Sequence, residues 1–196
     1  MRTKDFDPDL ALERAMHLFW SQGYEATGIT DLTEHLGIAR ASLYATFGSK
    51  SELYQRALNR YCTKQARPHL EALDAPGPFL PRIERILHHL ADAAAGDPAR
   101  RGCLVVNATA ERTPADAETT RQVQEHLRHE QEVLRRALER AQGAGEVRTD
   151  QTATAQAGFL MATILGLRVL GKAMADTDQL HDVVGVALDA LHPPNR

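Results

Sequence analysis

Hydrophobic residues recur at intervals of three or four along most of the chain, which is the spacing of one face of an α-helix. The first run covers residues 8–22, where Asp7 and Pro8 suit a cap and a first helical residue and Gly23 stops the pattern. Turn residues divide the rest of the chain into further helices, so we predict an all-α fold of about nine helices. The predicted ranges are 8–22, 28–36, a short helix ending before Gly48, 49–73, 79–95, 103–112, 113–142, 150–175 and 178–191.

The second and third helices are short and closely joined. Thr27 is expected to cap the helix over 28–36, and Gly37 to end it in a tight turn, because glycine adopts positive φ at no steric cost. In the next helix Leu43 and Phe47, four residues apart, face the core together. A pair of short helices joined in this way is typical of a helix-turn-helix, whose second helix enters the DNA major groove. The side chains left on its outer face are Arg40, Ala41, Ser42, Tyr44 and Thr46.

The remaining helices differ in length and in polarity. Ser49 and Glu52 have the spacing of a capping box, so a helix should begin there and run to about residue 73, with a bend near Pro68. The stretch "DAPGPFLP" then breaks the chain. The last two helices are apolar around much of their circumference, which is typical of a buried helix or an oligomer interface. Their glycines, which permit close approach of helices, are Gly158, Gly166, Gly171 and Gly185.

Positive charge is concentrated beside the short helices. The chain as a whole carries a net charge of −3, yet residues 37–67 hold six Lys and Arg side chains against one Glu. Arg40 suits guanine edges or phosphate, and the hydroxyl of Tyr44 suits phosphate oxygens. Lys50 stands at the positive end of the following helix and would add a second phosphate anchor. The charge pattern therefore favours DNA as a partner.

The stretch "LFWSQGYEATGITDLTEHLGIARASLYATFGSKSELYQRAL", residues 18–58, resembles the N-terminal domain of TetR/AcrR-family transcriptional regulators. The resemblance extends over about residues 8–60 and implies a homodimeric repressor. Residues 1–48 would form a DNA-binding domain that reads a palindromic operator. Residues 49–196 would bind an unknown small-molecule effector and form the dimer through the last two helices. Transferred position by position, the DNA contacts fall on Ile29, Thr30, Arg40, Ala41, Ser42, Tyr44, Thr46 and Lys50.

The effector site is expected in the C-terminal part of the chain. Cys103, Asn107 and Glu111 repeat every four residues and would form one polar face on a short helix. The resemblance implies that this region can line the ligand pocket, and we add Phe159 and Thr163 as candidates. Packing is the simpler interpretation of Cys103 and Asn107. Only two aromatic residues lie beyond position 61, so a small or aliphatic effector is favoured over a large planar one.

A thiol-based sensor of oxidants or electrophiles is an alternative on the same scaffold. Cys103 would lie in the first turn of its helix, where unpaired N–H groups and the neighbouring Arg100 and Arg101 would stabilise a thiolate. Burial of the thiol would oppose this effect. Cys62 is interpreted as packing.

Other functional classes have weaker support. His88-His89 and the pair His126 and His129 invite a metal site, but the second pair lies in a charged stretch that is typical of a solvated face, so no metal or cofactor is predicted. An enzyme would need a nucleophile with a base, paired carboxylates or a phosphate loop, and no such spacing is found. A helical adaptor without DNA binding would not need the polar face of the third helix.

The chain is expected in the cytoplasm, without a membrane partner. Its N-terminus lacks the apolar core of a signal peptide, and its longest apolar stretch, "GFLMATILGLRVL", is interrupted by Arg168 and is too short to cross a bilayer. Two widely separated cysteines match neither a disulfide framework nor a zinc site and indicate a reducing compartment.

Overall fold

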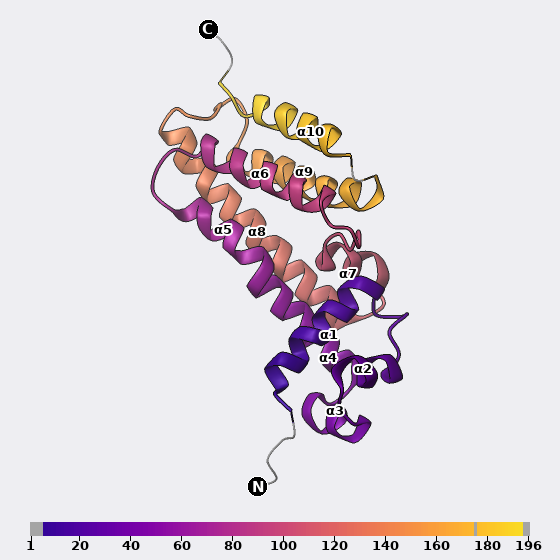
Figure 1. Cartoon of the computed structure of the whole chain (residues 1–196). Helices are drawn as coiled ribbons and strands as arrows, with labels where there is room; N and C mark the ends of the chain where they lie inside the picture. The colour runs from indigo at the N-terminus through magenta and orange to yellow at the C-terminus, as the bar shows by residue number, and fades with distance from the viewer. Residues whose placement is uncertain (1–5, 175, 194–196) are drawn as a thin grey trace. The chain divides into compact units, whose positions relative to one another are not determined.

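The structure is a computed structural model that describes residues 6–174 and 176–193, with the side chains at positions 66, 67, 70 and 71 left out. Its described part consists of helices and their connections, as predicted (Figure 1). One more α-helix is present than expected, because the range 49–73 is divided. The elements are α1 (Pro8–Gln22), α2 (Ile29–Leu36), α3 (Arg40–Phe47), α4 (Lys50–Tyr61), the π-helical turn η1 (Cys62–Ala66), α5 (Arg67–Asp74), α6 (Leu80–Ala95), α7 (Leu104–Arg112), α8 (Ala117–Gly143), α9 (Ala153–Ala173) and α10 (Thr177–Asp189).

The chain divides into two compact units. The first comprises residues 1–66 and 103–123, and the second comprises residues 67–102 and 124–196. Helices α4 and α7 therefore belong to the same unit as the helix-turn-helix. The division of functions at residue 48 stays a prediction, since a compact unit is defined by contacts and not by what it binds.

The core of the first unit lies between α1 and α4. Phe19 and Tyr54 are fully buried, and their rings meet edge to face with centroids 5.1 Å apart. Leu32 of α2 and Leu43 and Phe47 of α3 are also buried, as their spacing predicted. These apolar contacts place both short helices on the α1–α4 framework.

Several helix ends are as predicted. Asp7 accepts a hydrogen bond from the N–H of Asp9 at 2.8 Å, and Ser49 accepts one from the N–H of Glu52 at 3.1 Å. Gly37 adopts the left-handed conformation with φ +67° and closes the turn between α2 and α3. Thus caps that use neighbours in sequence could be recognised from the sequence.

Other helix ends correct the predictions. Thr27 does not cap α2: it is fully buried, and its hydroxyl donates to the carbonyl of Gly23 at 2.6 Å. Gly28 precedes α2 instead, and its N–H donates to Asp31. Helix α8 begins at Ala117, not at Thr113, because the carboxylate of Asp116 accepts the N–H of Thr119 at 2.6 Å.

The break in the fourth predicted helix lies earlier than Pro68. Helix α4 ends at Tyr61, a π-helical turn follows, and α5 begins at Arg67. Pro68 has no N–H to offer the carbonyl four residues before it, so regular α-helical bonding cannot continue through this segment. The π-helical turn is the point at which the hydrogen-bonding pattern changes, and it ends two residues before Pro68.

Helices α6, α9 and α10 pack on one another in the second unit and share an apolar core with α8 (Figure 1). Leu134 and Leu138 of α8, four residues apart and therefore on one face of the helix, are fully buried. Gly171 of α9 lies directly against Ala94 of α6. The absence of a side chain at Gly171 allows this close approach.

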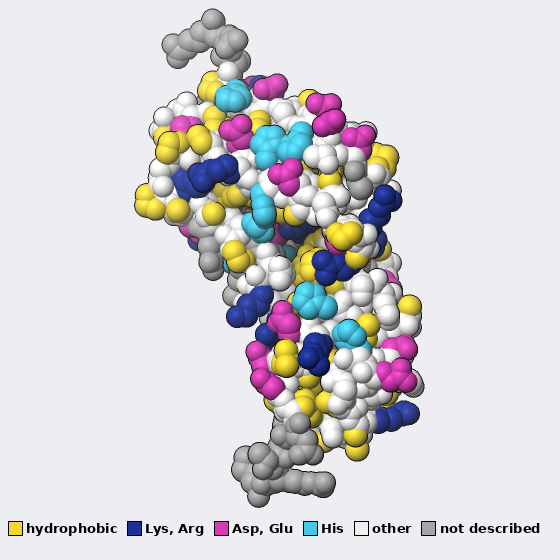
Figure 2. All heavy atoms as spheres, in the orientation of Figure 1, with side chains coloured by type: hydrophobic (Ala, Val, Ile, Leu, Met, Phe, Trp, Pro, Cys, Tyr) yellow, Lys and Arg dark blue, Asp and Glu magenta, His cyan; other side chains and the backbone are white. Residues whose placement is uncertain are grey.

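A polar link joins α6 and α10. The Nδ1 atoms of His88 and His181 lie 2.5 Å apart, and Nε2 of His181 lies 2.9 Å from a carboxylate oxygen of Asp92. Figure 2 shows histidine side chains with acidic neighbours gathered on this face of the second unit. The carboxylate of Asp92 can only accept, so Nε2–H of His181 donates this hydrogen bond, and in a ring with one N–H the Nδ1 of His181 then accepts a hydrogen bond from Nδ1–H of His88.

Helix α9 is longer than the apolar stretch read from the sequence. It has 21 residues, and by length and composition alone it could cross a membrane, the one such helix in the described ranges. The helix therefore extends on both sides of the apolar stretch noted in the sequence. Helix α9 packs against α6 and α10 and buries residues such as Leu160 and Leu167. These are the contacts of a core helix, which can have the same length and composition as a membrane span.

We predict that Gly171→Ala lowers the free energy of unfolding by about 1–2 kcal/mol, since its Cβ would lie 2.4 Å from Cβ of Ala94 and 2.9 Å from the Ala94 carbonyl carbon. Gly158→Ala is the matched control, because its Cβ meets only Gln131 at 3.9 Å and should stabilise α9 by about 0.5–1 kcal/mol. Urea denaturation at one protein concentration measures both. Equal stabilities would show that α6 and α9 are not tightly packed.

Candidate nucleic-acid interface

The geometry of α2 and α3 is set by the turn between them. The N–H of Gly37 donates to the carbonyl of Glu34, and the N–H of Ile38 donates to that of Thr33. Leu36 before the turn and Leu43 after it both point into the core. The outer face of α3 is therefore directed away from the core by its two buried residues.

The outer face of α3 is exposed as the sequence predicted. Arg40 and Ala41 are exposed, Ser42 and Thr46 are half-buried, and the side chain of Tyr44 is 37% exposed. The guanidinium of Arg40 lies over the ring of Tyr44 at 5.6 Å, and its Nη2 lies 3.4 Å from the Tyr44 hydroxyl. This weak contact leaves the donors of Arg40 available to a ligand.

The other predicted DNA contacts flank α3. Ile29 and Thr30 form the first turn of α2, half-buried and exposed respectively. Lys50 is the first residue of α4, and its ammonium lies 4.1 Å from the ring centroid of Tyr24. All eight predicted contact residues thus lie in the first unit, on α2, α3 and the start of α4.

Two arginines of the basic segment 37–67 make contacts within the protein. Arg60 is mostly buried and pairs with Asp9 at 2.7 Å and also with Glu13, both on α1. The hydrogen bond and the charge of Arg60 lower the pKa of Asp9. Arg56 donates to the backbone carbonyl of Thr46 and lies over Phe47, so it supports the end of α3. The side chain of Arg67 lies outside the described part of the structure.

Sequence analysis missed a link from α7 to the turn between α1 and α2. Both carboxylate oxygens of Glu111 accept backbone N–H groups, from Tyr24 at 2.9 Å and from Glu25 at 2.8 Å. Arg112 pairs with Glu25 at 3.1 Å and with Asp116 at 2.8 Å. Glu111 and Arg112 lie 86 or 87 positions after their partners Tyr24 and Glu25. The sole signal in the sequence is therefore an adjacent acidic and basic residue near the end of a helix.

Tyr54 of α4 packs against Tyr24 of this turn, with ring centroids 4.9 Å apart. Burial, and after it the charge of Glu111, raise the pKa of Tyr54 against the opposing charge of Arg112. Its hydroxyl has no hydrogen-bond partner among the residues that the structure describes. Tyr54 therefore remains a neutral core aromatic at any physiological pH.

The predicted effector residues fall in different units. Cys103 is buried and caps α7 instead of standing in its first turn, and Asn107 is half-buried. With Glu111 they belong to the first unit. Phe159, 43% exposed, and Thr163, whose hydroxyl donates to the carbonyl of Phe159, belong to the second. Their role in binding an effector stays a prediction.

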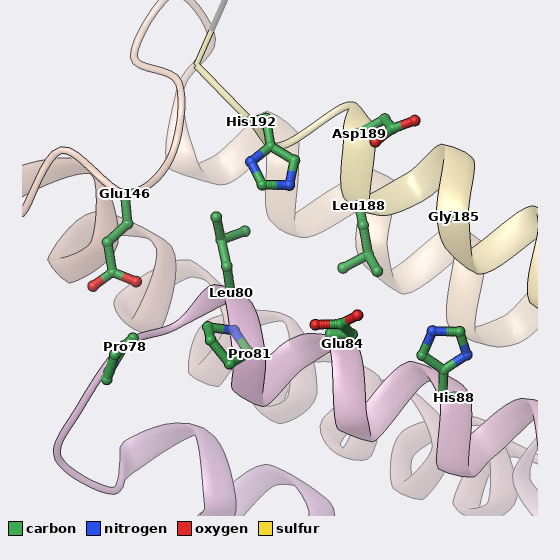
Figure 3. A pocket seen from close by; sticks show the side chains of 10 residues that line it. All are labelled: Pro78, Leu80, Pro81, Glu84, His88, Glu146, Gly185, Leu188, Asp189 and His192. Carbon is green, nitrogen blue, oxygen red and sulfur yellow. The ribbon is translucent and has the colours of Figure 1, made fainter.

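A cavity of about 720 Å³ opens between α6 and α10 in the second unit (Figure 3). Glu84 and His88 point into it from α6, and Leu188 and Asp189 line it from α10. Glu146 also lines it and accepts the N–H of Phe79 at 2.6 Å. None of the five predicted effector residues lines this cavity.

His126 and Glu130 correct the interpretation of α8 as a solvated charged face. Their side chains are 7% and 4% exposed, and Nε2 of His126 lies 3.2 Å from a carboxylate oxygen of Glu130. That distance is short enough for an ion pair, but Nε2 is not aligned for a hydrogen bond. Burial raises the pKa of Glu130, but His126 and then Arg168 outweigh it and hold the pKa below its usual value. No group of three or more His, Cys, Asp or Glu in the described ranges could hold a metal ion.

The sequence matches two family profiles that together span most of the chain. Residues 11–57 match bacterial regulatory proteins of the TetR family, and residues 80–186 match a tetracyclin repressor-like C-terminal domain. The chain is 35% identical over 191 residues to the uncharacterized HTH-type transcriptional regulator YezE of Bacillus subtilis, covering 97% of this chain and 98% of that protein. The chain therefore belongs to the TetR family of transcriptional regulators.

Two further relatives add detail. The HTH-type transcriptional repressor ComR of Escherichia coli is 28% identical over 188 residues, covering 95% of this chain and 90% of ComR. A cysteine-substituted variant of the TetR family regulator CifR, solved with 26 bp double-strand operator DNA, superposes with a TM-score of 0.86. It is 31% identical and covers 97% of this chain and 100% of CifR. Transcription regulation through a DNA-binding helix-turn-helix is thus confirmed.

We predict that Glu111→Ala lowers the free energy of unfolding by about 1–3 kcal/mol, because two backbone N–H groups lose a charged acceptor. Glu34→Ala is the matched control, as Glu34 is an exposed helical glutamate of the same unit whose side chain forms no hydrogen bond or ion pair with a described residue. Thermal unfolding at fixed protein concentration compares them. The structural role of Glu111 is refuted if the two variants lose the same stability.

Proposed function

We propose that the chain is a repressor that binds a palindromic operator as a homodimer and releases it when a small-molecule effector binds. The observation that carries this proposal is the exposed face of α3, in which Arg40, Ser42 and Tyr44 stand outward on a helix whose other side is fixed in the core. An α-helix fits the major groove of DNA, where side chains reach base edges. The helix α3 is therefore proposed as the recognition helix.

Each part of this face suits a different element of DNA. Arg40 has a forked set of donors for guanine or phosphate, and Ala41 and Ser42 are small enough for the backbone to come close. The hydroxyl of Tyr44 and the ammonium of Lys50 are proposed to fix the register on phosphates. The exposed Thr30 adds a further hydroxyl from α2.

A homodimer through α9 and α10 is supported by apolar side chains left in solvent. Phe159 and Val169 on α9 and Val186 on α10 are 43%, 49% and 69% exposed. A Cβ placed on Gly166 or Gly185 would meet no atom within 4 Å, so these positions leave room for another helix. Two copies would present two recognition helices to the two halves of a palindrome.

The effector is proposed to act by changing the separation of the two recognition helices, which would break their match to the operator. The second unit offers polar groups for such a molecule, among them Glu84 and His88 in the cavity between α6 and α10. Direct sensing through Cys103 is less well supported, since its side chain is 3% exposed. A TetR-family regulator implies a location in the cytoplasm and action by occluding the promoter.

Fluorescence anisotropy with duplexes tiled across the DNA flanking the gene, at two salt concentrations, tests the proposal. Tight, salt-sensitive binding confined to one palindromic tile is expected, because phosphate contacts release counterions. Binding to none of the tiles, followed by failure of a random-sequence selection, would favour a helical adaptor or an enzyme instead.

We predict that Arg40→Ala weakens operator binding by about 1–3 kcal/mol, because α3 loses its base or phosphate contact. Arg128→Ala is the matched control, since Arg128 is an exposed arginine on α8 that donates a hydrogen bond to its helix neighbour Gln124. Anisotropy titrations with the selected tile compare the two. An unchanged affinity in Arg40→Ala would remove Arg40 from the interface.

We predict that Val186→Asp weakens self-association by at least about 2 kcal/mol per dimer, because it would bury an unpaired charge in the proposed interface. Leu10→Asp is the control, as Leu10 is a 51% exposed apolar residue on α1. Sedimentation velocity over a concentration series gives the dimer affinity. A dimer that tolerates Val186→Asp as well as Leu10→Asp would place the interface elsewhere.

A further inference from the structure

The ring of Tyr24 lies at the centre of an unusual arrangement of charge. Tyr24 belongs to the turn between α1 and α2, and two cations lie close to its ring: the ammonium of Lys50 at 4.1 Å and the guanidinium of Arg112 at 3.8 Å from the centroid. Tyr54 meets the same ring at an angle of 68°, with centroids 4.9 Å apart. One aromatic side chain therefore contacts α4 and α7 together.

The turn that carries Tyr24 is itself fixed from α7. Glu111 accepts the N–H groups of Tyr24 and Glu25, and Gly23 before them has φ +85°. A Cβ at Gly23 would lie 2.9 Å from a carboxylate oxygen of Glu111. A glycine is thus required both by the backbone conformation and by the approach of the carboxylate. The position of the Tyr24 ring follows from these bonds.

The two cations differ in what neutralises them. Arg112 has carboxylate partners in Glu25 and Asp116. No carboxylate among the described residues pairs with Lys50, whose ammonium lies over the Tyr24 ring. The π-face attracts the ammonium without cancelling its charge, which is what an anchor for phosphate requires.

We infer that Tyr24 is a positioning residue for DNA binding: its ring holds the ammonium of Lys50 in place before the operator arrives. A free lysine side chain loses conformational freedom when it is fixed on a phosphate. A lysine already held against a ring loses less. The inference rests on the proposed role of Lys50 as a phosphate anchor, and it adds that α7, through Glu111 and Arg112, sets where that anchor stands.

The test is a double-mutant cycle on operator affinity. Tyr24→Leu removes the π-face, whereas Tyr24→Phe keeps it and serves as the conservative control. We expect Tyr24→Phe to bind within about 2-fold of the natural protein and Tyr24→Leu to bind about 5- to 30-fold more weakly, since each of the two protomers loses the cation–π contact that holds Lys50. In a Lys50→Ala background, Tyr24→Leu should have no further effect beyond about 2-fold.

Two readouts separate positioning from general support of the fold. Lys50→Ala should reduce the slope of log affinity against log salt by about two per dimer, one phosphate contact in each protomer. In the DNA-free protein, the ring current of Tyr24 should shift the Cε methylene protons of Lys50 upfield in NMR spectra. That shift should persist in Tyr24→Phe and vanish in Tyr24→Leu, whatever the affinity of the variants.

The outcomes distinguish this inference from the proposed function. If Lys50→Ala leaves operator affinity and its salt slope unchanged, Lys50 is not a phosphate anchor, and both statements about it fail. If Lys50→Ala weakens binding but Tyr24→Leu weakens it equally in both backgrounds, Tyr24 supports the turn alone and the positioning role is overturned. Loss of affinity in Tyr24→Phe equal to that in Tyr24→Leu would overturn it as well.

Discussion

Helices of eight residues do not hold together in water on their own, and both helices that carry the proposed DNA-binding face have that length. They depend on the apolar core between α1 and α4, where Phe19 meets Tyr54 and where Leu32 and Leu43 are buried. The outer face of α3 can consequently be small, polar and charged without endangering the fold. Stability is supplied on one side of the helix and recognition on the other.

Charge in the first unit is divided in a similar way. Arg60 and Arg112 are tied to carboxylates of the same unit and hold helices and turns together. Arg40 and Lys50 have aromatic rings beside them and no carboxylate partner in the described chain. An aromatic neighbour restricts a cation but leaves its charge for the nucleic acid. The local excess of basic residues in the sequence therefore overstates the charge available to DNA.

Much of the fold could be predicted from the sequence, because its signals are local. Asp7, Ser49 and Gly37 end or begin helices through bonds to residues within three or four positions. The exposure of α3 followed from the spacing of Leu43 and Phe47. Within the candidate site, the residues of α3 were thus identifiable.

The remaining features depend on partners far away in the sequence. The carboxylate of Glu111 was assigned to an effector site, yet its bonds reach residues 24 and 25. The burial of His126 and Glu130 arises from the helices around α8, so a charged stretch alone could not reveal it. Thr27 has the right type for a cap but is taken up by the carbonyl of Gly23. A periodic pattern specifies which face is apolar and leaves open what meets it.

The bonds from Glu111 to the turn between α1 and α2 also bear on protein engineering. If an N-terminal segment ending after α3 or α4 were exchanged between regulators, it would lose Glu111, whose carboxylate binds the turn between α1 and α2. The portable module is therefore discontinuous, made of residues 1–66 together with 103–123. Chimeras that move both segments keep the hydrogen bonds to this turn. A chimera cut at a single junction would exchange the side chains of the proposed recognition helix without the Glu111 carboxylate that fixes the turn before it.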